Sequence, residues 1–189
     1  DEVIVRARVS SLEAGATALA ASGGAVADAE AIARIDIYDA VTVDLAANLS
    51  ITGETVTISA EHNGVELTSS SDAETDGLYA NANSEARAHY DSHNDVVAAG
   101  GATVAAGTLN VFSDQHVAKY SRSATADVDV FGNETTSTPG SFLPERAIDW
   151  NGDITFLADL TPVLEIASNG DIVVANGVTV NGQSSGNVS

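Results

Sequence analysis

Two histidines, His89 and His93, lie four residues apart, a spacing that on a helix could direct both side chains to one metal ion. We expect them instead on and just after a β-strand, where residues four apart are separated by about 13 Å. No glutamate follows His89 in the pattern of the zinc proteases. A further histidine, His62, lies near the end of another predicted strand. The sequence therefore predicts that all three are variable surface residues and not metal ligands.

Aspartates form a second group of candidates, because some β-helix proteins cleave polysaccharides with paired acids in a surface groove. Those in comparable parts of the repeating units described below are Asp36, Asp39, Asp44, Asp91 and Asp95. Enzymes of this kind usually set Lys, Arg or a bound cation beside the acids, and basic residues are scarce in this chain. The sequence therefore favours a solvated acidic face and no catalytic residue. A carbohydrate-active β-helix enzyme with an acidic surface groove is the alternative.

Two Asn-Gly-Asp turns provide a third candidate, a calcium site. They occupy residues 151–153 and 169–171 and bring side-chain and carbonyl oxygens close together, as a hard cation requires. Neither turn has the spacing of an EF-hand loop or of the Gly-Gly-x-Gly-x-Asp calcium repeat. A weak calcium site at Asp153 and Asp171 is therefore a hypothesis, and we expect no other cofactor.

The composition limits the partners that these residues could have. There are 27 acidic residues against 7 basic ones, and the net charge is −20, so the chain lacks the positive surface that nucleic acid requires. Cysteine is absent, which excludes disulfides and thiolate chemistry. No apolar run approaches the roughly 18 residues that span a bilayer. Methionine is also absent and the chain starts in mid-pattern, so we expect a piece of a longer protein without membrane insertion.

All of these candidates lie within a sequence repeat. Residues 41–60 resemble residues 94–113, and the step between them is 53 residues. The same step connects Val3, Val56 and Leu109. The units are about 1–53, 54–106 and a partial third unit, 107–133. A constant period is the signature of a repeat architecture.

Each unit also contains a long stretch of small residues. Residues 12–33 are rich in alanine and would pass as a helix, but their counterparts at 65–86 are rich in Ser, Thr, Asp and Asn, which disfavour helix interiors. The two copies share Gly-Gly at 23–24 and Asp-Gly at 76–77, which are hairpin turn signals. We therefore predict a hairpin-like arm in each unit.

After the third unit the pattern changes. The Pro-, Ser- and Thr-rich residues 134–145 are predicted to be a loop or module boundary. Residues 146–182 read as a C-terminal module of short strands, and residues 183–189 as a linker or frayed end.

A lone unit of this kind buries too little apolar area to be stable, whereas stacked units pair their backbones and form continuous side-chain columns. The predicted fold is therefore all-β: a parallel β-solenoid of about 53-residue repeats with hairpin-like arms, similar to a right-handed β-helix. Antiparallel contact inside the arms is left open.

The repeat, together with residues 146–182, resembles the β-strand-repeat modules of giant bacterial secreted filamentous adhesins, of the leukotoxin-family and filamentous-haemagglutinin-like kind. The residues that carry this resemblance are Arg146, Ile148, Trp150, Asp153, Ile154, Pro162, Leu164, Ile166 and Gly170. The resemblance implies a non-catalytic segment of an extracellular or cell-surface fibre that acts as a rigid spacer or filament wall. Its expected partners are neighbouring repeats or identical chains that stack through β-strands, and glycans or proteins on host or neighbouring cells.

Overall fold

The chain forms a parallel β-solenoid in a computed structural model that describes residues 1–157, 163–168 and 171–174. Within these residues every helix or strand element is a strand, and every pairing between strands is parallel. The all-β fold predicted from the repeat is therefore confirmed. Antiparallel pairing inside the arms, which the sequence left open, is not found in the described residues.

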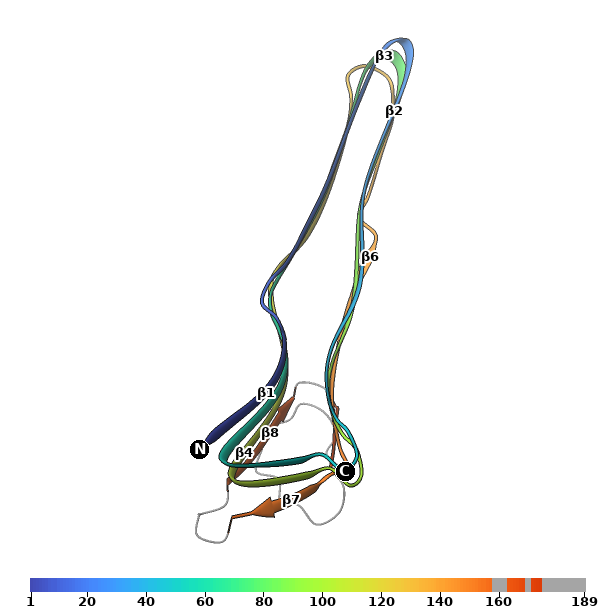
Figure 1. Ribbon diagram of the computed structural model, residues 1–189. Helices are drawn as coiled ribbons and strands as arrows, with labels where there is room; N and C mark the ends of the chain where they lie inside the picture. Colours follow the sequence, from blue (N-terminus) through green and yellow to red (C-terminus); the bar gives the residue numbers. More distant parts are fainter. Residues whose placement is uncertain (158–162, 169–170, 175–189) are drawn as a thin grey trace.

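Successive turns of the chain stack as four coils. Coil one contains β1 (Glu2–Val9) and β2 (Leu12–Leu45), and coil two is β3 (Ser50–Ala98). Coil three contains β4 (Thr103–Val128), β5 (Gly132–Ser137) and β6 (Gly140–Trp150). Coil four contains β7 (Asp153–Phe156), β8 (Val163–Ser168) and β9 (Asp171–Val174). Figure 1 shows that the coils build two regions, a wide base from which β1 starts and a long narrow arm that projects from it.

Residues one repeat apart are neighbours along the stack. Val3 pairs with Val56, and Val56 pairs with Leu109, so the predicted column is confirmed. Each coil lies about 4.8 Å from the next, so the backbone N–H and C=O groups of β3 can bond to coils on both sides. The repeat period is thus a consequence of this register.

The base is a coil with three walls around a hydrophobic core. The first wall along the chain contains β1, residues 55–62, residues 108–115 and β8. The second wall contains residues 41–45, 94–98 and 147–150 together with β9. The third wall contains residues 50–53 and 103–106 together with β7. Large apolar side chains such as Ile58, Leu109 and Ile148 alternate inward and are fully buried. Trp150 is also buried, and its Nε1–H donates to the Gly152 carbonyl at 3.0 Å.

The arm has two facing walls, because each of the first three coils runs outward to the tip and then returns. At the root of the arm, Val65, Leu67 and Tyr90 form a buried apolar cluster, and nearer the tip small side chains fill the space between the walls. One buried cluster consists of Ala29, Ala31, Ala73 and Ala82. The hydroxyls of Ser71 and Ser84 lie 2.6 Å apart across the arm. Side chains of this size allow the walls to approach closely, and the ladder between coils overrides the helix propensity of the alanine-rich segment.

The turn at the tip depends on glycine in coil two. A Cβ atom at Gly77 would lie 2.9 Å from the Ala27 Cβ and 3.1 Å from the Gly24 carbonyl oxygen. The turn therefore lies at the glycine residues predicted from the sequence, Gly24 in coil one and Gly77 in coil two. In coil two the glycine is needed for close approach between coils, whereas Gly24 in coil one has a φ of 142°.

The prediction that residues 134–145 form a loop is wrong. β5 and most of β6 are the returning wall of the third arm and pair in parallel with β3. The offset between partners is 53 residues at Thr75 and Val128 but 52 at Ala80 and Gly132. Coil three has therefore lost one residue at the tip, which conceals the repeat in a comparison at constant spacing.

Coil four has no arm. In coil three the arm lies between two residues of the base, Ser113 and Ala147. Ser113 pairs with Ser168 of coil four, and Ala147 pairs with Asp171. These two partners are almost adjacent in sequence. Residues 146–150 belong to β6, and β7 to β9 continue the stack on the base. Residues 175–182 of the predicted module and the predicted linker, 183–189, lie outside the described residues.

Candidate functional site

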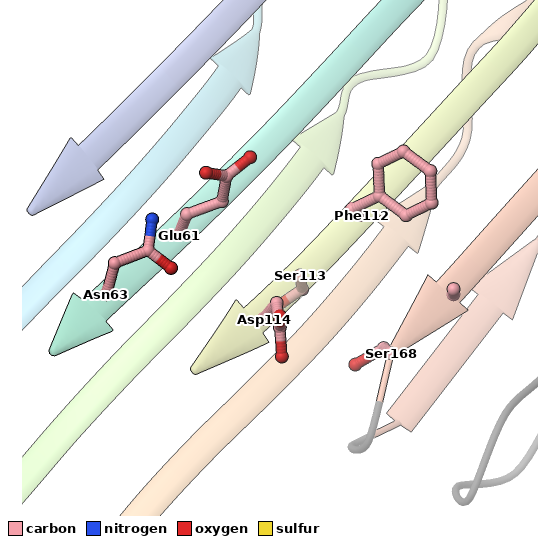
Figure 2. Close-up of a pocket in the computed structure, with 7 residues that line it drawn as sticks. Glu61, Asn63, Phe112, Ser113, Asp114 and Ser168 are labelled. Atoms are coloured by element: carbon pink, nitrogen blue, oxygen red, sulfur yellow. The ribbon is translucent and has the colours of Figure 1, made fainter. Parts of the chain in front are cut away.

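An open groove lies where the short fourth coil leaves the third arm uncovered. Its lining residues are Glu61, Asn63, Phe112, Ser113, Asp114, Ala167 and Ser168. Figure 2 shows that they come from three neighbouring strands, with Glu61 and Asn63 on β3, Phe112 and Asp114 on β4, and Ser168 at the end of β8. Two of the lining residues, Glu61 and Asp114, are acidic. The enzyme alternative predicts an acidic surface groove of this kind.

The two carboxylates of this groove already have partners. Glu61 forms ion pairs with Arg6 at 3.3 Å and Arg8 at 3.9 Å, and only a fifth of its side chain is exposed. An oxygen of Asp114 accepts the backbone N–H of Gln115 at 2.8 Å. Glu61 therefore pairs with cations of the adjacent coil, and Asp114 bonds within its own strand.

The aspartates singled out in the sequence do not converge in this groove. All lie on the returning walls of the arms or on the wall of the base that follows them: Asp36, Asp39, Asp44, Asp91 and Asp95. Asp36 and Asp44 face solvent, and Asp36 pairs with Arg87 at 3.7 Å. Burial raises the pKa of the Asp95 carboxyl, with His93 opposing this rise and Glu145 adding to it. Asp39 is different, because it points inward.

His62 is the inward partner of Asp39, and the prediction that it is a surface residue is wrong. Its side chain is completely buried. Nε2 lies 2.8 Å from Asp39 Oδ2, and Nδ1 lies 2.5 Å from Asn94 Oδ1. Asn94 uses its Nδ2 to donate to the Asp114 carbonyl at 2.8 Å, which fixes its oxygen toward the ring. Nδ1 therefore carries a proton.

Further polar groups extend this buried network at the root of the arm. Gln115 donates from Nε2 to the Tyr90 hydroxyl at 2.8 Å, and Ser92 donates to Gln115 Oε1 at 3.2 Å. Burial raises the pKa of the Tyr90 phenol. Hydrogen bonding with Ser92 and Gln115 opposes this rise, and the charge of Asp39 adds to it. These bonds cross from the outgoing to the returning wall, so the network fastens the two walls where the base narrows into the arm.

The other two candidate histidines, His89 and His93, do not meet at one site. His93 Nδ1 lies 3.2 Å from Glu145 Oε2, and His89 hydrogen-bonds to Ser141 through Nδ1. Asp36, His89 and Ser141 are in register on three successive coils. The Asp36 carboxylate forms its ion pair with Arg87, and the His89 ring packs against Tyr38. A catalytic triad requires the acid to bond to the histidine and the histidine to bond to the serine. In this column the acid, Asp36, pairs with Arg87 and not with His89, so the triad is not formed.

The geometry of the turn at residues 151–153 does not add support to the calcium hypothesis. In the first turn the Gly152 carbonyl accepts the Trp150 N–H, and Asn151 donates to Asp149 at 2.7 Å. Asp153 begins β7 and pairs with Thr103, while part of the turn before Asp171 lies outside the described residues. Within the described ranges, no three His, Asp or Glu side chains are close enough to hold a metal ion together.

The strongest candidate for a binding site is the tip of the arm, at the top of Figure 1. Each of five large apolar side chains at the turns is more than half exposed, namely Val26, Leu78, Tyr79, Val130 and Phe131. Val26 and Tyr79 are partners in the ladder, so the turns of successive coils place these side chains close together. We call these five residues the tip patch. Exposed apolar groups that gather in this way mark interaction surfaces more often than isolated ones do.

The tip also has a hollow with acidic residues. It is lined by Gly24, Ala25, Asp76, Gly77, Leu78, Asp129 and Val130, which come from the turns of three coils. Asp76 and Asp129 lie on neighbouring coils, and the hydrogen bond that protonated Asp129 donates to Asp76, together with the charge of Asp76, raises the pKa of Asp129. Two like charges thus face each other beside an apolar surface.

The tip patch and the His62 network were not predicted from the sequence, although the sequence contains a signal for each. Apolar residues directly after a predicted turn are a signal, because turns are usually polar. His62 continues the inward alternation of Val56, Ile58 and Ala60. Alternation along a strand would have placed it inside.

Comparisons with known proteins give no further assignment, since no family model, no curated protein and no solved structure matches this chain. The part of the chain that the structure describes contains no helix with the length and hydrophobicity of a membrane span.

Proposed function

We propose that this chain is a non-catalytic structural and adhesive segment of a large extracellular or cell-surface fibrous protein. The observation that supports this proposal most directly is the arm: three coils stacked in register that project from the base and end in an exposed apolar tip. A ladder of this kind holds its tip at a fixed distance, as a spacer must. The high negative charge keeps neighbouring fibres apart.

Stacking with further repeats or with identical chains is part of this proposal. The 34-residue strand β2 pairs with β3 on one edge, and within the described residues its other edge has no strand partner. Unprotected strand edges of this length add further strands. The proposed partners are thus adjoining repeats, identical chains, and proteins or glycans at the cell surface.

Immunogold labelling of the native cells tests the proposal. An antibody raised against this chain should decorate material outside the cell, with gold particles spaced along fibres. Label confined to the cell interior would contradict it. Pre-incubating the antibody with the purified chain is the control and should abolish the label.

A further inference from the structure

We propose that the tip of the arm docks a basic polypeptide and that an arginine or lysine side chain of this partner enters the hollow between Asp76 and Asp129. This inference rests on the proposed adhesive function and names the chemistry of the partner.

The shape of the tip accounts for the apolar part of the partner. Leu78 and Val130 line the hollow, and Tyr79 and Phe131 are exposed beside it. Arginine and lysine have long apolar stems that pack against such side chains while the charged end reaches beyond them. Apolar side chains next to the basic residue would cover the aromatic rings.

Charge complementarity selects the partner. Asp76 and Asp129 are exposed, and the hydrogen bond that protonated Asp129 donates to Asp76, together with the repulsion between the two charges, raises the pKa of Asp129. A guanidinium group between them would replace this repulsion with two charge-assisted hydrogen bonds. A second copy of the tip would bring more negative charge to the same place, and an anionic lipid surface would do the same. The observations therefore favour a cationic peptide over either of them.

The apolar side chains of the tip patch are separate from the buried cluster of the outer arm. That cluster consists of Ala29, Ala31, Ala73 and Ala82, and the residues packed against it are Ala18, Ala20, Ala126 and Val128. A second hollow on the arm offers a direct comparison, because it also has two carboxylates in register, Glu13 and Glu66. Its other lining residues are Ala14, Gly15 and Thr68, so it carries acids without large apolar side chains.

The experiment measures binding of a fluorescent Gly-Ser peptide that contains Leu-Arg-Leu, by fluorescence anisotropy. Asp76→Asn with Asp129→Asn should weaken binding roughly tenfold or more, because two hydrogen bonds to a charged group are lost. Leu78→Ser with Val130→Ser should weaken it similarly. The control is Glu13→Gln with Glu66→Gln, which removes the same formal charge elsewhere, breaks the ion pair of Glu66 with Lys119, and should leave affinity within about threefold.

Several results would overturn the inference. One is an equal loss in the control variant, which would indicate diffuse attraction to an acidic chain. Another is equal binding of a peptide with Leu-Glu-Leu. A third is binding of zwitterionic lipid vesicles through the tip without binding of the Leu-Arg-Leu peptide, which would identify a membrane surface. Retained circular dichroism establishes that each variant folds.

The inference and the proposed function can fail separately. Label outside the cell combined with unchanged peptide binding in the Asp76 and Asp129 variant would remove the docking proposal alone. Label inside the cell combined with tip-specific peptide binding would remove the extracellular role alone.

Discussion

The base and the arm of this molecule are built from the same ladder but have different interiors. In the base, Ile58, Leu109 and Trp150 fill a hydrophobic core. At the root of the arm, Val65, Leu67 and Tyr90 form a second buried apolar cluster, but nearer the tip the inward positions hold mainly alanine and serine, and hydroxyls bond across the gap. The base is therefore stabilised mainly by burial of large apolar groups, whereas the outer part of the arm is stabilised by backbone pairing and close packing. A continuous repeat can thus include a thin region without losing its register.

The largest effect should come from the base. Leu109→Ala removes a fully buried side chain between β3 and β8 and should lower the free energy of unfolding by about 2–5 kcal/mol. Urea unfolding measures the change. A loss of less than about 1 kcal/mol would mean that the base has no tightly packed core.

In the arm, the opposite kind of substitution should be harmful. Ala73→Leu inserts a large group between the closely spaced walls and should cost about 1–3 kcal/mol. Ala21→Leu on the exposed outer face of the same arm is the control and should change stability by less than about 0.5 kcal/mol. If Ala73 and Ala21 behaved alike in urea unfolding, the walls would not be in contact.

The junction between base and arm should respond to alkaline pH. The folded state holds the Tyr90 proton more tightly than the unfolded state, because burial raises the pKa of this phenol. The stability from this difference is present below about pH 10 and is lost as the pH rises through the folded-state pKa. Absorbance at 295 nm should show one late-ionising tyrosine, and Tyr90→Phe should remove it. Unchanged late ionisation in this variant would assign the effect to another residue.

The smallest effect on stability should come from the tip. Tyr79→Ser and Phe131→Ser replace exposed side chains and should each change the free energy of unfolding by less than about 0.5 kcal/mol. A thermal melt checks this result. A large destabilisation would mean that the tip patch holds the turns together.

Much of the fold could be predicted from the sequence, because stacking leaves a constant spacing between equivalent residues. Val3, Val56 and Leu109 revealed the column directly. The returning wall of the third arm was missed because one residue is absent at the tip, so every later partner is displaced by one. Composition near Pro144 then favoured a loop, although an edge strand tolerates proline.

The candidate sites were less predictable, for a physical reason. His62 acquires its partners from other walls and coils, Asp39 and Asn94, which no local pattern connects. The tip patch likewise exists only because three turns are brought side by side. Residues such as His89 and His93, which looked like a pair in sequence, are held apart by the extended strand.

The central claim is the parallel, in-register stack that extends along the arm, and a disulfide cross-link tests it directly. The natural chain has no cysteine, and the hydroxyls of Thr17 and Ser70 lie 3.3 Å apart on adjacent coils. Cysteines at these two positions should form a disulfide rapidly, since partners about 4.8 Å apart meet its geometric requirement. Cysteines at Thr17 and Asp72, two residues out of register, should not. Equal cross-linking of both pairs, or faster cross-linking of the second, would contradict the stacked arm.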